Sequence, residues 1–214
     1  MQIASKPTRA AVSAALGAVL ILTGAQNVGA APASAASAPA ERQAAAAAPS
    51  YYLKFVKRKD TDSDRTTTPY NNSRLHLMQS VAGAADRTIA HYRAGSGVNG
   101  RVCSVGKGWL PNGKYKIEFH RKNFDGIING YVIKISDKRC SSAAGAPTRT
   151  ALFIHSEMKP NGGQGSIESE RWDGYRDYNS EGCIKVQHTN IKKLFGKIDT
   201  LGWSRLKGLV VTGP

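Results

Sequence analysis

Two short segments of this 214-residue chain combine residue types that could perform nucleophilic catalysis. Residues 179–186 read N-S-E-G-C-I-K-V and contain Cys183 directly after a glycine. Residues 152–156 read L-F-I-H-S and place His155 at the end of an apolar run. A free thiol has a pKa of about 8.5, so a nearby histidine is needed to take its proton at neutral pH. The two segments therefore predict a cysteine nucleophile with a histidine base.

The glycine before the cysteine meets a second requirement of this chemistry. Gly182 allows the backbone to turn closely beside Cys183, because glycine accepts conformations that other residues avoid. Backbone amides around these two residues could then bind the negative oxygen that forms when a thiolate attacks a carbonyl group. Most histidines next to apolar strands only satisfy structural hydrogen bonds, and we give that interpretation to His76, His91, His120 and His188.

A zinc site is the rival chemistry for the same residues. His155, Cys183 and His188 could supply one sulfur and two nitrogen ligands, with Glu181 as general base. Their spacing matches no common zinc pattern. We therefore expect no metal and no other cofactor.

The elements that must position these segments are mostly β-strands. Apolar and polar residues alternate with a period of two in several runs, and turns rich in Gly, Pro and Asn separate them. The alternating runs begin or lie at residues 75–77, 89–92, 115–119 and 131–135, whereas residues 151–154 and 209–211 are short runs of apolar residues only. Short strands at this spacing are typical of a barrel or a sandwich. The sequence therefore predicts a mainly β fold, a closed or sandwich-like β-barrel with one or two short helices.

One helix is expected close to the C-terminus. Apolar residues recur there at helical spacing, and we expect this stripe to be core. They are Ile191, Leu194, Phe195, Ile198 and Leu201. Thr189 or Asn190 is the expected N-terminal cap. Residues 82–86 could begin a second short helix.

The N-terminal region predicts export. Lys6 and Arg9 precede an apolar stretch and small residues that suit cleavage, which is the order of a secretory signal peptide. The apolar stretch is shorter than the roughly 20 residues that a membrane span needs. We therefore expect a cleaved signal peptide over residues 1–30, a flexible spacer rich in Ala, Pro and Ser over 31–50 and one folded domain over 51–214.

Three cysteines in an exported chain leave one unpaired. Cys103 and Cys140 each lie near the end of an expected strand, and an oxidising compartment favours a disulfide between them. Cys183 would then be free. A buried cysteine that acts as a small hydrophobe is the alternative, but the sequence around Cys183 argues against it.

The chain is strongly basic, with 30 Lys and Arg against 15 Asp and Glu and a formal net charge of +15. Such a charge concentrates polyanions. Residues 54–59, next to Tyr51 and Tyr52, could bind nucleic acid on composition alone, but an edge strand guarded by lysines is favoured. Export argues against nucleic acid, and the chain shows no basic amphipathic helix for lipid. Anionic wall polymers are the polyanion that fits the compartment.

Together with residues 110–117, L-P-N-G-K-Y-K-I, the two catalytic segments resemble the L,D-transpeptidase (YkuD-type) catalytic domain. That family shows, in the same order, a T-P-x-G-x-F-x-I hairpin, a strand ending in His, and an S/T-H-G-C-hydrophobic-R/N motif. A helix and a final strand follow in the family. The resemblance covers most of residues 75–211. It implies the family's barrel fold, a secreted or cell-wall location and peptidoglycan stem peptides as substrate.

The resemblance also implies roles for individual residues. Cys183 would attack a stem peptide and form an acyl-enzyme, His155 would be the base, and Ser156 would orient His155 through its carbonyl or hydroxyl group. Lys185 would meet a stem-peptide carboxylate in the place of the family's Arg or Asn. The residues expected on the oxyanion and substrate side are Ser180, Glu181, Gly182 and Lys185. The product would be a 3→3 crosslink.

The chain departs from the family pattern at two points. Glu181 stands where the common motif has a second histidine, and its carboxylate would raise the thiol pKa unless it points away or meets a cation, for which Lys185 and Arg176 are the candidates. The His-to-Cys spacing is also longer than usual. The Gly-rich residues 159–178 between them would form a lid or a substrate-shaping loop, and a plain surface loop is the alternative. Two alternatives therefore stay open: an L,D-carboxypeptidase that uses water as acceptor, and a non-catalytic peptidoglycan-binding wall protein.

Overall fold

The computed structural model describes residues 48–59 and 72–214, which belong to one compact unit. The predicted signal peptide and nearly all of the predicted spacer lie outside the described residues. Within the described part, no helix has the length and apolar character needed to cross a membrane.

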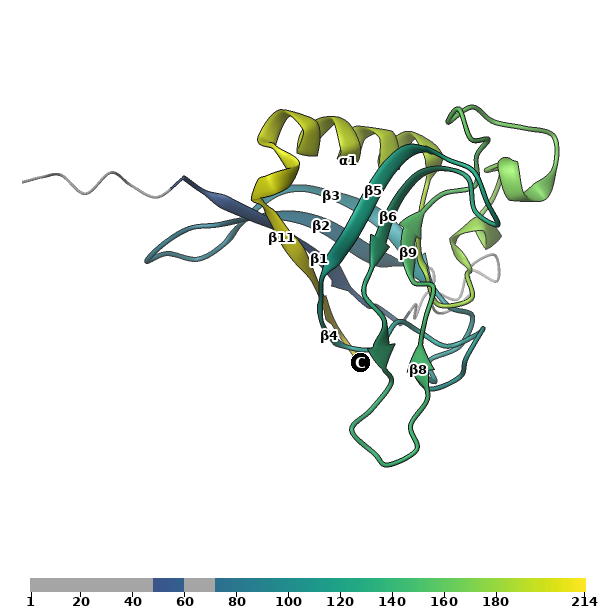
Figure 1. Cartoon of the computed structure of the whole chain (residues 1–214), viewed down its shortest axis with the longest axis horizontal. Coiled ribbons are helices and arrows are strands. Elements are labelled where there is room, and N and C mark those ends of the chain that lie inside the picture. The colour runs from purple at the N-terminus through teal and green to yellow at the C-terminus, as the bar shows by residue number, and fades with distance from the viewer. Residues whose placement is uncertain (1–47, 60–71) are drawn as a thin grey trace, which may run out of the picture. The chain divides into compact units, whose positions relative to one another are not determined.

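A nine-stranded sheet forms the frame of the domain (Figure 1). Its strands, in sheet order, are β4 (Gly113–Tyr115), β11 (Leu206–Thr212), β1 (Ser50–Val56), β2 (Ser73–Ser80), β3 (Arg87–Ser96), β10 (Ile184–Val186), β9 (Phe153–His155), β6 (Gly130–Ile135) and β5 (Ile117–Phe124). A small second sheet pairs β7 (Lys138–Arg139) with β8 (Thr148–Arg149). The helical elements are α1 (His188–Leu201) and the single 3₁₀ turns η1 (Glu168–Glu170), η2 (Arg176–Tyr178) and η3 (Trp203–Arg205).

The two edge strands of the large sheet follow each other in the chain, so the sheet curls back on itself. Only Lys116 separates β4 from β5. Lys116 accepts a hydrogen bond from the Ser136 amide at 2.9 Å, and its own amide donates to Ser136 Oγ at 3.1 Å. The predicted mainly β, barrel-like fold is confirmed, as a nearly closed barrel.

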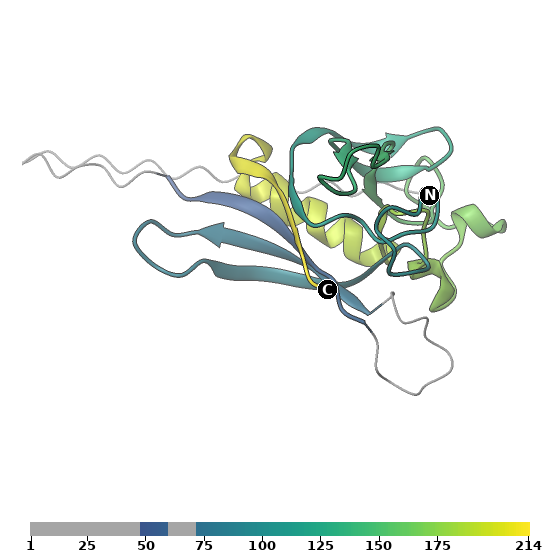
Figure 2. The ribbon, with the colours of Figure 1, turned by 90° about the horizontal axis from the view of Figure 1, so that it is seen from below.

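Helix α1 fills the inside of the curved sheet, where Figure 2 shows it between the two arms. Its buried residues are Ile191, Leu194, Phe195 and Ile198, as the apolar spacing predicted. Ile154 of β9 and Ile184 of β10 face this core and are fully buried. Because side chains alternate along a strand, the neighbours of these two isoleucines must project from the opposite, outer face.

The predicted edge strand at residues 54–59 is wrong, because β1 lies inside the sheet. It pairs in parallel with β11 on one side and antiparallel with β2 on the other. The C-terminal strand provides the second partner, and such a distant pairing leaves no local signal. Lys57 is buried as a result, with its Nζ 5.1 Å from the Trp109 ring centroid, and burial lowers its pKa to about 8.

Two helix details also differ from the prediction. Residues 82–86 form the exposed turn between β2 and β3, because the hairpin reverses direction there. Helix α1 begins at His188 with Gln187 as its cap residue, so Thr189 and Asn190 lie inside the first turn.

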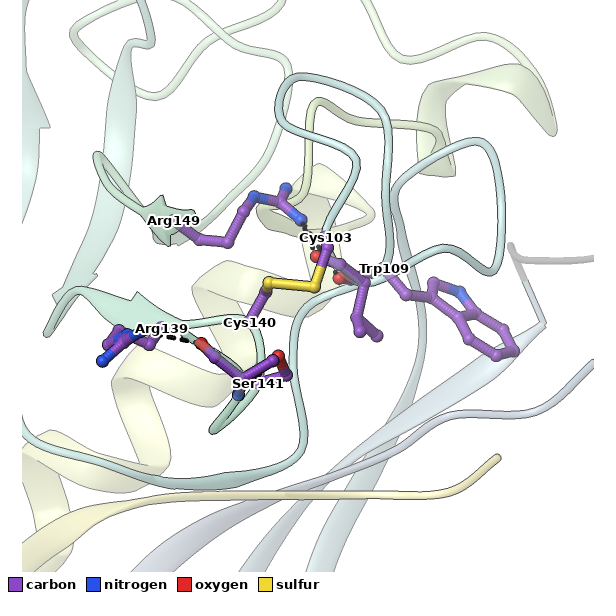
Figure 3. The surroundings of a disulfide bond; sticks show 8 residues. Cys103, Trp109, Arg139, Cys140, Ser141 and Arg149 are labelled. Carbon is purple, nitrogen blue, oxygen red and sulfur yellow. Dashed lines mark hydrogen bonds between the residues drawn. A yellow bond between two sulfur atoms is a disulfide. The ribbon is translucent and has the colours of Figure 1, made fainter. Parts of the chain in front are cut away.

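The predicted disulfide between Cys103 and Cys140 is present (Figure 3). Their Cα atoms are 5.0 Å apart, and the bond closes a stretch of 37 residues in the chain. It ties the turns that follow β3 to the end of β7. Cys183 is the free cysteine.

Replacing both bridged cysteines, Cys103→Ser with Cys140→Ser, should lower the free energy of unfolding by about 4 kcal/mol, because the bond restricts the unfolded chain. Denaturant unfolding monitored by circular dichroism measures the change. Cys183→Ser is the matched control and should leave the midpoint close to that of the wild type. Equal stability of all three proteins would contradict a structural role for the bond.

Candidate active site

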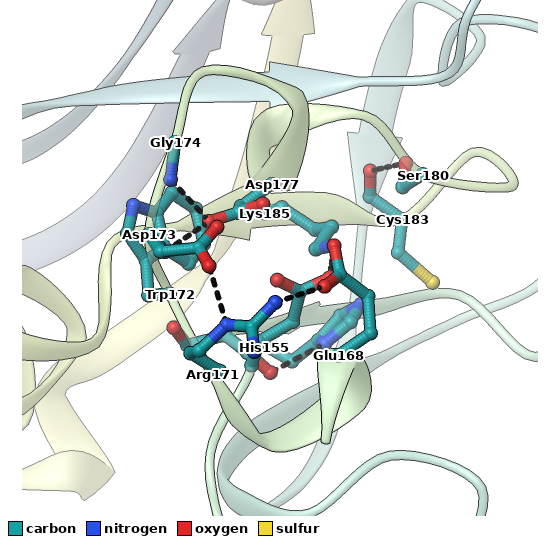
Figure 4. Close-up of polar contacts among 12 residues, drawn as sticks. His155, Glu168, Arg171, Trp172, Asp173, Gly174, Asp177, Ser180, Cys183 and Lys185 are labelled. Atoms are coloured by element: carbon teal, nitrogen blue, oxygen red, sulfur yellow. Dashed lines mark hydrogen bonds and ion pairs between the residues drawn. The ribbon is translucent and has the colours of Figure 1, made fainter. Parts of the chain in front are cut away.

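The parallel pairing of β9 with β10 brings the predicted nucleophile and base to one face of the sheet. Ile184 pairs with Ile154, and Lys185 pairs with His155. Cys183 directly precedes β10 and projects from the same outer face as Lys185 and His155. Figure 4 shows the three side chains in one group.

Serine hydroxyl groups hold the turn that carries the nucleophile. Ser180 Oγ donates to the Cys183 carbonyl at 2.6 Å and accepts from the Gly182 amide at 3.1 Å. It also accepts from the Gly97 amide at 2.9 Å. Ser96 Oγ donates to the Gly182 carbonyl at 3.1 Å. The Ser180 hydroxyl and the Gly182 amide are thus both used in hydrogen bonds that hold the turn. Of the two amides predicted to bind an oxyanion, those of Gly182 and Cys183, the Cys183 amide is therefore the remaining candidate.

Arg149 is the residue at this turn that the sequence did not reveal. It is 2 % exposed, and its guanidinium donates to the Glu181 carbonyl at 3.0 Å. Gly182 has φ +111°, and a Cβ at this position would collide with Arg149 Nη2. Glycine is therefore required at this position for two reasons: the positive φ angle, which other residues rarely adopt, and the lack of space for a Cβ atom. Lone basic residues in short loops are common, so nothing local marked Arg149.

The hydrogen bond of His155 fixes its tautomer. Nδ1 lies 3.0 Å from the Ser156 carbonyl oxygen, which can only accept, so Nδ1 carries the proton and Nε2 is the basic nitrogen. Of the two orienting groups expected of Ser156, the carbonyl makes this contact. His155 is 7 % exposed, and burial together with the charge of Lys185 lowers its pKa to about 4. The imidazole is therefore neutral at neutral pH.

The Cys183 thiol is partly exposed and close to the first residues of β9. Its sulfur lies 3.6 Å from the Ala151 carbonyl oxygen, to which it donates. Desolvation by the surrounding protein raises the pKa of the thiol, and the charge of Glu181 adds to this effect. The Phe153 amide and the charges of Arg149 and Lys185 act in the opposite direction. In the resting site, thiol and imidazole are both neutral.

Lys185 is engaged by an acidic residue of the protein itself. Its side chain is nearly buried and forms an ion pair with Glu157, a residue that the sequence analysis did not single out. Burial raises the pKa of Glu157, and the ion pair opposes this shift. In the described part of the chain, neither Lys185 nor Arg176 forms an ion pair with Glu181, whose side chain is exposed. Of the two conditions considered from the sequence, Glu181 therefore meets the first, because its side chain lies in solvent and neither cation pairs with it.

The Gly-rich segment between His155 and Cys183 packs over the outer face. A Cβ at Gly95, which pairs with Lys185, would collide with the Tyr178 carbonyl oxygen, so the segment lies directly on β3. Asp177 is buried and accepts hydrogen bonds from the Asp173 and Gly174 amides at 2.6 and 2.8 Å. These contacts give the segment a defined shape on the outer face.

The described residues contain one group of potential metal ligands, and it is not the set considered from the sequence. It consists of Glu168, Asp173 and Asp177, and the triad of His155, Cys183 and His188 is not brought together. Arg171 forms ion pairs with Glu168 and Asp173 (Figure 4), which places a protein cation at these carboxylates.

The described residues thus form a nearly closed β-barrel, with a free cysteine just before β10 and a buried histidine at the end of the neighbouring strand β9. The sequence model of the L,D-transpeptidase catalytic domain (YkuD) matches residues 81–210. The chain therefore belongs to the L,D-transpeptidase catalytic-domain family. A search of the curated proteins found no match.

Gly182→Ala should lower the free energy of unfolding by about 2 kcal/mol or more, because positive φ is strained for alanine and its Cβ meets Arg149. It should also slow alkylation of Cys183 by iodoacetamide. Gly174→Ala is the control, since this glycine has open space within 4 Å of an added Cβ. If both variants behave like the wild type, the packing of the turn is not as described.

Stability should fall as pH is lowered from about 6.5 to about 4, because the unfolded chain protonates His155 at its ordinary pKa of 6.5 and the folded chain only at about 4. Denaturant unfolding at pH 7 and pH 4 measures this loss. The wild type should lose up to about 3 kcal/mol more than His155→Gln over this interval. Parallel pH profiles of the two proteins would show that His155 is not buried in its neutral form.

Proposed function

We propose that this protein is an exported L,D-transpeptidase that forms 3→3 crosslinks between peptidoglycan stem peptides through an acyl-enzyme on Cys183. The observation that supports the proposal is the strand register, because it brings Cys183, which is the free cysteine, and His155, whose proton is held on Nδ1, to the same face of the sheet. Membership in the family supports peptidoglycan as the substrate. The predicted signal peptide supports export to the cell wall.

In the first half-reaction, the Cys183 sulfur attacks the carbonyl carbon of the third stem-peptide residue. His155 Nε2 accepts the thiol proton during this attack, since the resting pair is neutral and holds no preformed thiolate. The Cys183 amide is the proposed donor to the developing oxyanion. The bond to the terminal D-Ala then breaks, His155 returns the proton to the leaving amine, and a thioester remains.

In the second half-reaction, a side-chain amine of another stem peptide attacks the thioester. His155 accepts a proton from this amine, the new amide bond forms, and the Cys183 sulfur leaves and regains its proton. Water in place of the amine would give carboxypeptidase activity at the same site. The acceptor therefore decides between these two activities.

Lys185 is proposed to bind a stem-peptide carboxylate, but Glu157 of the protein competes for its ammonium group. A stem-peptide carboxylate would have to replace Glu157 as its partner. Anionic wall polymers remain a proposed partner of the domain because of the net charge of +15.

Incubation of the protein with a disaccharide-tetrapeptide should yield crosslinked dimer, with release of D-Ala, by mass spectrometry. Cys183→Ala should yield none, and His155→Gln should be slower by 10²- to 10⁴-fold, the usual contribution of a general base. The rate should rise with pH above neutrality, because the pKa of the Cys183 thiol is raised.

Other products lead to other assignments. Tripeptide without dimer would identify a carboxypeptidase. A carbapenem should add its mass to the wild type and not to Cys183→Ala, as the family resemblance implies. Absence of product and adduct alike would overturn the enzyme assignment and favour a peptidoglycan-binding protein that Glu181 keeps inactive.

A further inference from the structure

Arg149 is a buried cation whose guanidinium is surrounded by main-chain carbonyl groups. Nη1 donates to the carbonyls of Val102 at 2.7 Å and Trp109 at 3.3 Å, and Nη2 donates to those of Gly108 at 3.2 Å and Glu181 at 3.0 Å. One side chain thus joins the turns after β3 to the turn that carries the nucleophile. The planar fork of arginine suits this task, because it presents several donors in fixed directions.

The carbonyl groups satisfy the hydrogen bonds of Arg149 but do not neutralise its charge. Within the described residues, no Asp or Glu side chain forms an ion pair with it. A buried charge without a counter-charge is costly, so proteins rarely keep one without use. Arg149 and Cys183 stabilise each other's charged forms, since Arg149 lowers the thiol pKa and Cys183 raises that of the guanidinium.

Other charged groups face the thiol from the surrounding elements. Lys185 of β10 also favours the thiolate, but the ion pair with Glu157 partly neutralises the charge of Lys185. Glu181 of the turn disfavours the thiolate, and its exposed side chain is screened by water. His155 of β9 is neutral. Arg149, reaching in from β8, is therefore the cation near the thiol that no carboxylate opposes.

We propose that Arg149 is a positioning residue of the active site, which holds the Glu181–Cys183 turn through its carbonyl bonds and provides the counter-charge for the Cys183 thiolate. It offsets the carboxylate that Glu181 introduces in place of the family's histidine. This inference rests on the proposed function only in taking Cys183 as the nucleophile.

The disulfide belongs to the same arrangement (Figure 3). Val102, an acceptor of Arg149, is adjacent to Cys103, and Cys140 follows β7, the partner strand of β8. The bond therefore holds the acceptor turn and the strand pair that carries Arg149 at a fixed separation. Arg139, on β7, is the matched control residue, because it is exposed. Among the residues that the structure describes, its guanidinium donates only to the Ala143 carbonyl of its own hairpin, at 2.9 Å.

The experiment uses the oxidised full chain, in which Cys183 is the free thiol, and iodoacetamide as probe, so it does not require peptidoglycan chemistry. In Arg149→Met, the pH profile of alkylation should move to higher pH, and the rate at pH 7 should fall on the order of tenfold. Arg139→Met should match the wild type. A folded Arg149→Met protein with the wild-type profile would overturn the proposal.

The variant Arg149→Lys keeps the positive charge and loses the hydrogen-bonding fork, so it tests the two roles of Arg149 separately. It also tests the proposal if Arg149→Met does not fold. Its alkylation profile should stay near that of the wild type, because the charge is retained. Amide exchange of residues 180–184 should become faster, because a lysine cannot reproduce the fork. Wild-type exchange would overturn the positioning role, and a profile shifted to higher pH would overturn the role of the charge. Failure of peptidoglycan turnover in the wild type would contradict the proposed function and leave these readouts intact.

Discussion

The parallel pairing between β9 and β10 is the contact on which the rest of the site depends. These two strands lie near the middle of the nine-stranded sheet, and their isoleucines are buried against α1. Sliding either strand by a single residue would turn the isoleucine of that strand out of the core. Burial of the inner face therefore locks the register, and the register places Cys183 and His155 together on the outer face.

Desolvation sets the electrostatic character of this site. Lowering the pKa of His155 from 6.5 to about 4 corresponds to about 3 kcal/mol in favour of the neutral ring. The same burial raises the pKa of the Cys183 thiol. The charges of Arg149 and Lys185 reduce that shift without reversing it. The site thus rests as a neutral pair, and proton transfer must accompany attack on substrate.

The structure accommodates Glu181 at the position where the family motif has a histidine. Its carboxylate extends into solvent, while its carbonyl is bound by Arg149. The backbone of Glu181 is therefore part of the site, and its side chain contributes only a partly screened charge.

The sequence by itself determined the mainly β fold, the apolar face of α1, the free Cys183 and the paired Cys103 and Cys140, because each leaves a local pattern or a count of residues. Tertiary structure alone decided that β1 is interior, since its second partner β11 comes from the far end of the chain. It also decided that Lys185 pairs with Glu157 and that Arg149 reaches the nucleophile turn. Such contacts join residues far apart in the chain, and their energies depend on a burial that no local pattern encodes.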